Sequence, residues 1–139
     1  MSHLGYVASR YAVDVIVTTA IWTAADGRAQ WNGESLNHWS NVLTSELVAL
    51  FDPVEIWLFG SVARGDDGGD SDLDIMIVLD HYNTADAIDL KHRAIVSTKT
   101  PAPFDVAFSD PERMARRVGV VGAIERAVRL DGVLKYRRG

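Results

Sequence analysis

Two short apolar segments on either side of a polar, glycine-rich loop constrain the fold of this chain more than any other feature. The first segment, residues 54–59, is bounded by Pro53 and Gly60, and the second, residues 72–79, is rich in Ile, Val and Leu. Short apolar runs between turn residues are typical of buried β-strands. The loop between them, residues 66–71, supplies the Gly, Asp and Ser with which a chain reverses direction. The sequence therefore predicts an antiparallel pair of strands.

One helix is predicted before this strand pair and two after it. Ser35 is a candidate N-cap for a helix that ends near Phe51. Within residues 35–51, apolar residues recur at spacings of three and four. Thr84 is expected to cap a second helix over residues 84–97. A third helix is predicted over residues 109–131, with a Ser-x-x-Glu capping box at its start, and Gly119 and Gly122 are the positions at which it could be interrupted.

Two further strands and an N-terminal extension complete the predicted organisation. Residues 104–108 and 133–136 are expected to be short strands. Residues 1–34 precede the first helix and contain an alternating, strand-like segment at 11–17 and two turn dipeptides, Asp-Gly and Asn-Gly, typical of a hairpin or linker. A chain of 139 residues has room for one compact domain. We therefore predict an α/β fold of the α+β type over residues 35–139, with a mixed β-sheet flanked by helices.

The composition excludes several classes of site. The chain has no cysteine, which rules out disulfides, a thiol nucleophile and a cysteine-bound zinc, and which favours a reducing cytoplasm. Its four histidines stand singly, so they lack the spacing of a metal site. The apolar run of residues 11–25 is shorter than the roughly 20 residues that span a bilayer, so no membrane helix is expected. Arg10 and the small residues at 23–25 leave a signal peptide as the less favoured alternative.

The charge of the chain is unevenly distributed. A formal net charge of −5 argues against a general nucleic-acid binder. Residues 111–139 nevertheless carry a local charge of +5, against −10 for the remainder. Such a basic segment suits contact with phosphates or with an acidic partner, but it is more often a solvated helix face, which is the interpretation we favour.

Asp72 and Asp74 are the strongest candidates for chemistry. In a strand they project from the same face about 7 Å apart, while Leu73 and Ile75 face the core. Two neighbouring carboxylates repel each other unless a cation lies between them, and oxygen ligands without histidine favour Mg²⁺ or Mn²⁺. Asp105, on the polar face of its predicted strand, could lie beside the pair and supply a third carboxylate for a two-metal site.

Gly60 and Ser61 are the candidate phosphate-binding residues. They follow the end of a buried strand, where backbone N–H groups and a hydroxyl can hold phosphate oxygens, and a glycine lets the backbone approach a ligand closely. Arg64 either neutralises phosphate or pairs with Asp66 or Asp67 at the surface. Together with the aspartates, these residues predict one ligand, a nucleoside triphosphate with its metal.

Other sites fit the same residues less well. The acidic loop is a poor calcium-binding loop, because Ser71 stands at the sixth position from Asp66, where glycine is needed, and Ile77 at the twelfth, where Glu is needed. Gly60 and Ser61 alone could form an ordinary strand-to-helix turn, but the aspartates that follow favour the ligand site. A P-loop is excluded because no Gly-Lys-Ser/Thr occurs.

The candidate residues belong to three segments that resemble a known family. The segments LFGSVARG, SDLDI and FDV resemble the minimal nucleotidyltransferases of the DNA polymerase β-like superfamily, and the likeness extends over about residues 36–136. It implies a polymerase β-like palm in which Gly60 and Ser61 hold the triphosphate. Asp72 and Asp74 would bind the metals, and Asp105 would complete the metal site or act as a base.

The implied reaction is transfer of a nucleoside monophosphate, most simply AMP from ATP, to an acceptor hydroxyl with release of pyrophosphate. One small domain leaves little chain for an acceptor site, so a partner protein or a second copy of the chain is expected. The resemblance implies an antitoxin that adenylylates a tyrosine of a HEPN-type ribonuclease toxin. Two alternatives are a small-molecule nucleotidyltransferase akin to the aminoglycoside-modifying enzymes and a catalytically silent protein that binds its partner. The intact carboxylates argue against the silent protein.

Overall fold

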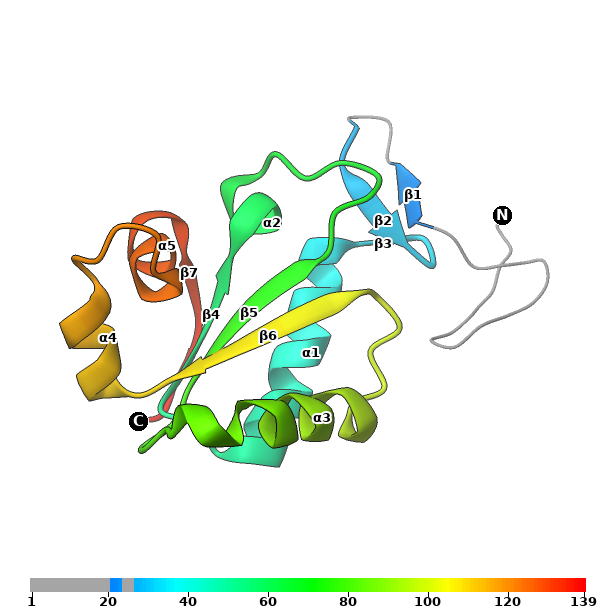
Figure 1. Cartoon of the computed structure of the whole chain (residues 1–139). Coiled ribbons are helices and arrows are strands. Elements are labelled where there is room, and N and C mark those ends of the chain that lie inside the picture. Colours follow the sequence, from blue (N-terminus) through cyan, green and yellow to red (C-terminus); the bar gives the residue numbers. More distant parts are fainter. Residues whose placement is uncertain (1–20, 24–26) are drawn as a thin grey trace.

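A four-stranded mixed sheet forms the centre of the molecule (Figure 1). The computed structural model describes residues 21–23 and 27–139. In the order of the sheet, the strands are β6 (Phe104–Ser109), β5 (Leu73–Val78), β4 (Glu55–Phe59) and β7 (Val133–Arg137). β4 runs antiparallel to β5 and to β7, and β5 runs parallel to β6. The predicted strand pair and both further strands are confirmed, while the strand predicted at 11–17 lies outside the described residues.

Helices cover both faces of this sheet (Figure 1). They are α1 (Leu36–Phe51), α2 (Gly60–Arg64), α3 (Ala87–Ser97), α4 (Pro111–Arg117) and α5 (Ile124–Asp131). On one face Ile75 of β5 packs in a core cluster with residues of α1 and α3. On the other face Met76 of β5 packs with Met114 of α4 and Val128 of α5. The alternation of β5 thus gives the sheet two buried faces, and the mixed sheet flanked by helices is confirmed.

A small second sheet precedes α1. Its strands β1 (Ile21–Thr23), β2 (Ala29–Trp31) and β3 (Glu34–Ser35) are antiparallel in chain order. Asn32 and Gly33 form the turn between β2 and β3, both with positive φ, as the predicted hairpin requires. Ala29 is fully buried in the cluster that also holds Ile75. The small sheet therefore packs directly on the domain.

Of the first two predicted helices, one starts as expected and one does not. Ser35 caps α1 as predicted, its side chain accepting a hydrogen bond from the backbone N–H of His38. Thr84, however, lies inside a single 3₁₀ turn, Thr84–Asp86, that precedes α3 and is capped by Asn83. Asn is as good an N-cap as Ser or Thr, so the shift by one residue follows local hydrogen bonding.

The helix predicted over residues 109–131 is divided: α4 and α5 are separate helices. Gly122 lies in the segment between them with a φ of +86°, which a continuous right-handed helix does not allow. The predicted capping box is wrong, because Ser109 is the last residue of β6 and Asp110 caps α4 by accepting from the N–H of Arg113. Pro111 at the first helical position fits this start. Within the part of the chain that the structure describes, no helix is long and apolar enough to cross a membrane.

Candidate active site

Asp74 and Asp105 lie opposite each other on the parallel strands β5 and β6. Residues paired in this way project from the same face of a sheet. Leu73 and Ile75 are fully buried on the opposite face, as the alternation predicts. Asp72 is exposed and directly precedes β5, so its carboxylate comes from the same edge as that of Asp74. The fold therefore brings Asp72 and Asp105 into the neighbourhood of Asp74, at one end of the β5–β6 pair.

The surroundings of Asp74 make this place unfavourable for negative charge. Burial, together with the charges of Asp72 and Asp105, raises the pKa of its carboxyl to about 6, while the charge of Arg64 acts in the opposite direction. The side chains of this region therefore leave an excess of negative charge that the protein does not neutralise. Such an excess is typical of a site that binds a cation.

Asp74→Asn is expected to stabilise the metal-free protein at neutral pH. A carboxyl whose pKa is higher in the folded than in the unfolded state contributes stability at low pH that is lost as the pH rises through its folded value. For Asp74 that loss falls between about pH 4 and pH 7. After allowance for partial exposure, the variant should gain about 1–2 kcal/mol over the wild type at pH 7.5.

Thermal or urea unfolding in EDTA at pH 4 and pH 7.5 measures this difference. Asp70→Asn, a change of the exposed acid in the same loop, is the matched control. An Asp74→Asn gain that is equal at both pH values would contradict the assignment of repulsion to this carboxyl.

Gly60 lies against the carboxylate of Asp74. Its φ is +78°, a conformation that side chains rarely adopt, and a Cβ at this position would overlap the carboxylate oxygen Oδ2 of Asp74. Glycine is therefore required here both by the backbone and by the space. The contact joins the predicted phosphate-binding turn directly to the predicted metal-binding strand.

Ser61 stands in the first turn of α2, the short helix that follows β4. The first N–H groups of a helix have no acceptor within it, and the side chain of Phe59 makes no capping hydrogen bond. The Ser61 hydroxyl donates to the hydroxyl oxygen of Ser71 at 3.2 Å. The donors at the start of α2 thus lie beside the end of the loop that leads into Asp72.

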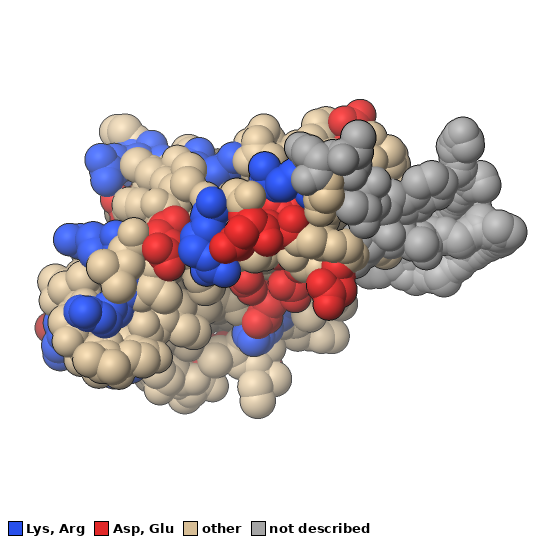
Figure 2. All heavy atoms as spheres, turned by 90° about the horizontal axis from the view of Figure 1, so that it is seen from above, with Lys and Arg blue, Asp and Glu red and all other residues tan. Residues whose placement is uncertain are grey.

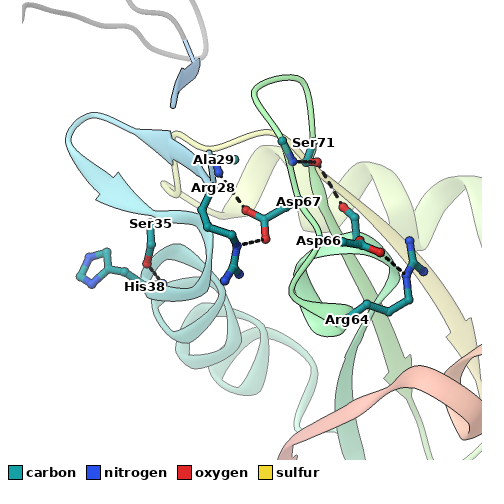
Figure 3. Close-up of polar contacts among 10 residues, drawn as sticks. Arg28, Ala29, Ser35, His38, Arg64, Asp66, Asp67 and Ser71 are labelled. Carbon is teal, nitrogen blue, oxygen red and sulfur yellow. Dashed lines mark hydrogen bonds and ion pairs between the residues drawn. The ribbon is translucent and has the colours of Figure 1, made fainter. Parts of the chain in front are cut away.

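Arg64 pairs with carboxylates at the surface. Its Nε donates to Asp66 at 3.2 Å (Figure 3). Its Nη1 lies 3.9 Å from Asp131. Of the predicted surface partners, Asp66 is therefore used and Asp67 is not. The charge of Arg64 also lowers the pKa of Asp74. Binding of phosphate by Arg64 stays a prediction.

Asp67 connects the loop between Ser61 and Asp72 to the small N-terminal sheet by an ion pair and a hydrogen bond (Figure 3). Its side chain is only 2% exposed and accepts from Nε of Arg28 at 2.6 Å and from the N–H of Ala29 at 2.9 Å. Ser71 closes the same loop by accepting from the N–H of Gly68 at 2.9 Å. The sequence contained no signal that singles out Asp67, since its neighbours are also acidic.

Acidic side chains gather on the face that carries α2 and this loop. Figure 2 shows Asp and Glu in a band across the middle of that face, with Lys and Arg among and beside them. Four of the eight basic residues of 111–139 form ion pairs in the described structure: Arg113 and Arg117 with Glu125, Arg137 with Glu55 at 2.8 Å, and Arg138 with Asp80. These pairs favour the solvated-face interpretation of the basic segment.

The three carboxylates suit a hard divalent cation but are not gathered around one point. Asp105 is 64% exposed, lies 3.1 Å from Nζ of Lys91 and accepts from the N–H of Val106. In the described ranges, 21–23 and 27–139, no three acidic or histidine side chains converge closely enough to hold a metal. The carboxylate oxygens, and the burial and mutual repulsion that raise the pKa of Asp74, fit a site for Mg²⁺ or Mn²⁺. Asp105, in contrast, is paired with Lys91.

Comparison with known proteins shows to which family the domain belongs. The sequence profile of the nucleotidyltransferase domain matches residues 41–129, which include every candidate site residue. The fold is similar to the crystal structure of a protein from Sulfolobus solfataricus that is provisionally assigned as a nucleotidyltransferase, with a TM-score of 0.54 and 22% sequence identity over 74% of this chain and 81% of that chain. No curated protein matches the chain. Because the profile covers more than half of the sequence and the fold agrees with it, this chain belongs to the nucleotidyltransferase domain family.

Proposed function

We propose that this protein transfers AMP from ATP to an acceptor hydroxyl, that Asp72 and Asp74 bind the Mg²⁺ that the reaction needs, and that Asp105 lies beside this metal site as the base. The observation that carries the proposal is the contact between Gly60 and the carboxylate of Asp74. It joins the element that would hold phosphate to the element that would hold metal. A nucleoside triphosphate with its metal is the ligand that needs both at one point.

In the proposed reaction the acceptor oxygen attacks the α-phosphorus of ATP. A bond forms between these two atoms, the bond from the α-phosphorus to the bridging oxygen breaks, and pyrophosphate leaves. The proton of the acceptor hydroxyl passes to the carboxylate of Asp105, which acts as the base. When bound, the metal neutralises the negative charge that develops on the phosphate oxygens and the leaving group.

The other residues of the site position the triphosphate. Ser61 and the backbone N–H groups at the start of α2 donate hydrogen bonds to phosphate oxygens. Asp67 and Ser71 hold the loop that follows, so that the turn and the aspartates keep their relative positions. Positioning of this kind carries much of the rate in phosphoryl-type transfer, where the protein supplies little covalent chemistry.

The acceptor we propose is a tyrosine of a HEPN-type ribonuclease toxin, with this chain as the cytoplasmic antitoxin. The described residues form one central four-stranded sheet and one small three-stranded sheet, which leaves little of the described chain for a separate acceptor domain. Its C-terminal third exposes large apolar side chains, including Val121 at 87% and Leu130 at 67%. Exposed aliphatic residues of this size suit a protein interface, with the toxin or with a second copy of the chain.

Incubation with ATP radiolabelled at the α-phosphate tests the proposal. We expect label on a tyrosine of a HEPN-type protein and none on an aminoglycoside. ATP labelled at the γ-phosphate should leave the protein unlabelled, which separates nucleotidyl from phosphoryl transfer. Label on an aminoglycoside and on no protein would overturn the antitoxin assignment in favour of a small-molecule nucleotidyltransferase.

A further inference from the structure

A cavity of about 330 Å³ adjoins Asp105 on the side away from Gly60. Met76 of β5 and Ala107 of β6 line it, each two residues beyond Asp74 and Asp105 on the paired strands. Residues two apart on a strand share a face, so this part of the lining continues the face that carries the carboxylates. Val106 and Phe108, which face the other side of β6, also line the cavity, so it lies at the edge of the sheet. A ligand in the cavity would therefore approach Asp105 along the sheet.

Two arginines of α4 line this cavity and are held by one buried carboxylate. The side chain of Glu125 is 4% exposed and accepts from Nε of Arg113 at 3.0 Å, from Nε of Arg117 at 3.1 Å and from the hydroxyl of Ser109 at 3.1 Å. Burial alone would raise the pKa of Glu125, but the hydrogen bonds, with the charge of Arg113, outweigh it and lower the pKa. Glu125 is therefore ionised and orients both guanidinium groups.

The arrangement leaves positive charge in the cavity. Among the described residues that line it, three cations, Lys91, Arg113 and Arg117, face the two carboxylates Asp105 and Glu125. In the part of the chain that is described, no hydrogen bond uses the terminal nitrogens of Arg113 or Arg117. Those nitrogens are strong donors that a carboxylate can accept in pairs.

We propose that this cavity is the acceptor site and that it binds a polypeptide segment in which an acidic residue stands beside the acceptor hydroxyl. The inference rests on the proposed function, and it adds the chemistry by which an acceptor is chosen. The hydroxyl would meet Asp105, and the acidic side chain would meet Arg113 and Arg117. A polypeptide fits better than a small molecule because Ile124, which lines the cavity, is 45% exposed, and Val121, three residues before it, is 87% exposed, and the surface of a partner protein would cover such apolar side chains.

The size of the cavity supports one inserted side chain. Ligand pockets usually measure about 300–1,000 Å³, so this one is at the small end. It has room for a tyrosine ring, which would lie beside the aromatic residues Tyr82 and Phe108 of the lining. It has no room for a nucleic acid strand, and the overall charge of −5 also disfavours one.

Short fluorescent peptides test the assignment by binding alone. In Gly-Asp-Tyr-Asp-Gly the tyrosine has acidic neighbours, and two matched peptides carry Asn or Lys in place of Asp. By fluorescence anisotropy we expect the Asp peptide to bind about tenfold or more tightly than the Asn peptide, since hydrogen bonds to charged groups are the stronger kind. Arg117→Gln should remove this preference.

Arg116→Gln is the matched control, because Arg116 is exposed, neighbours Arg117 on α4 and does not line the cavity. Arg113→Gln provides a second test if Arg117→Gln fails to fold, and the melting temperature of each variant decides that point. Equal affinity for the three peptides, or a preference that survives both cavity variants, would overturn the acceptor assignment.

The same peptides separate this assignment from the proposed function. Transfer of AMP to the Asp, Asn and Lys peptides at equal rates would overturn the acceptor site while leaving the reaction standing. Tight binding of the Asp peptide that depends on Arg117, with no transfer from ATP, would support the site and overturn the reaction.

Discussion

Replacing Asp72 and Asp74 together by Asn is expected to abolish nucleotidyl transfer, with a loss of rate of about 10³-fold or more. Asp74 is the site residue that the fold positions most directly, since it lies beside Gly60 and opposite Asp105, and Asp72 is two residues before it. Amides do not neutralise a divalent cation, and a bound metal supplies several kcal/mol of stabilisation to a developing phosphate charge. The fold should be intact, because the change relieves the repulsion that raises the pKa of Asp74.

Transfer from α-labelled ATP measures the rate, and thermal melts with and without MgATP measure binding. The wild type should show a rise in melting temperature with MgATP, and the double variant should show little. Asp70→Asn, in the same loop, should behave as the wild type. A double variant with the full metal-dependent shift would mean that Asp72 and Asp74 do not form the metal site.

The strand pair and its carboxylates could be predicted because their signals are local. Pro53 and Gly60 mark the ends of β4, and the alternation of β5 decides which side chains face the core. A period of two then fixes Asp72 and Asp74 on the face opposite Leu73. These inferences need no knowledge of distant parts of the chain, and the structure confirms the strands and the burial of Leu73.

The neighbours of β5 could not be predicted in the same way. Alternation places Asp105 on a face of its own strand, but it does not say which strand lies beside it. Only the parallel pairing of β6 with β5 brings Asp105 opposite Asp74. The position of Asp105 therefore depends on the crossover through α3, a long-range property that local patterns do not contain.

Buried charges were the other part of the structure that the sequence did not reveal. Asp67 lies among acidic residues in the sequence and Glu125 lies in a basic segment, and a solvated position is the ordinary expectation for both. Both are buried because a partner from elsewhere in the chain meets them, Arg28 for Asp67 and the α4 arginines for Glu125. The separation of α4 from α5 contributes to the burial of Glu125, because it lets the Glu125 carboxylate turn back and accept a hydrogen bond from Arg113.

Asp105→Asn is expected to lower the rate of transfer about 10²-fold or more and to leave binding of MgATP nearly unchanged. The two effects separate because Asp105 is exposed and paired with Lys91 at 3.1 Å, at the border between the triphosphate side and the cavity. A base that acts on the acceptor contributes to the transition state and little to the nucleotide complex. The MgATP melting shift and the rate at saturating MgATP are measured on one preparation, with Asp89→Asn on α3 as the exposed-acid control. Full transfer activity of the Asp105→Asn variant would mean that Asp105 is a surface residue without a catalytic role. A lost MgATP melting shift would mean that Asp105 is chiefly a metal ligand. The expected result is an enzyme with a low transfer rate that still binds MgATP.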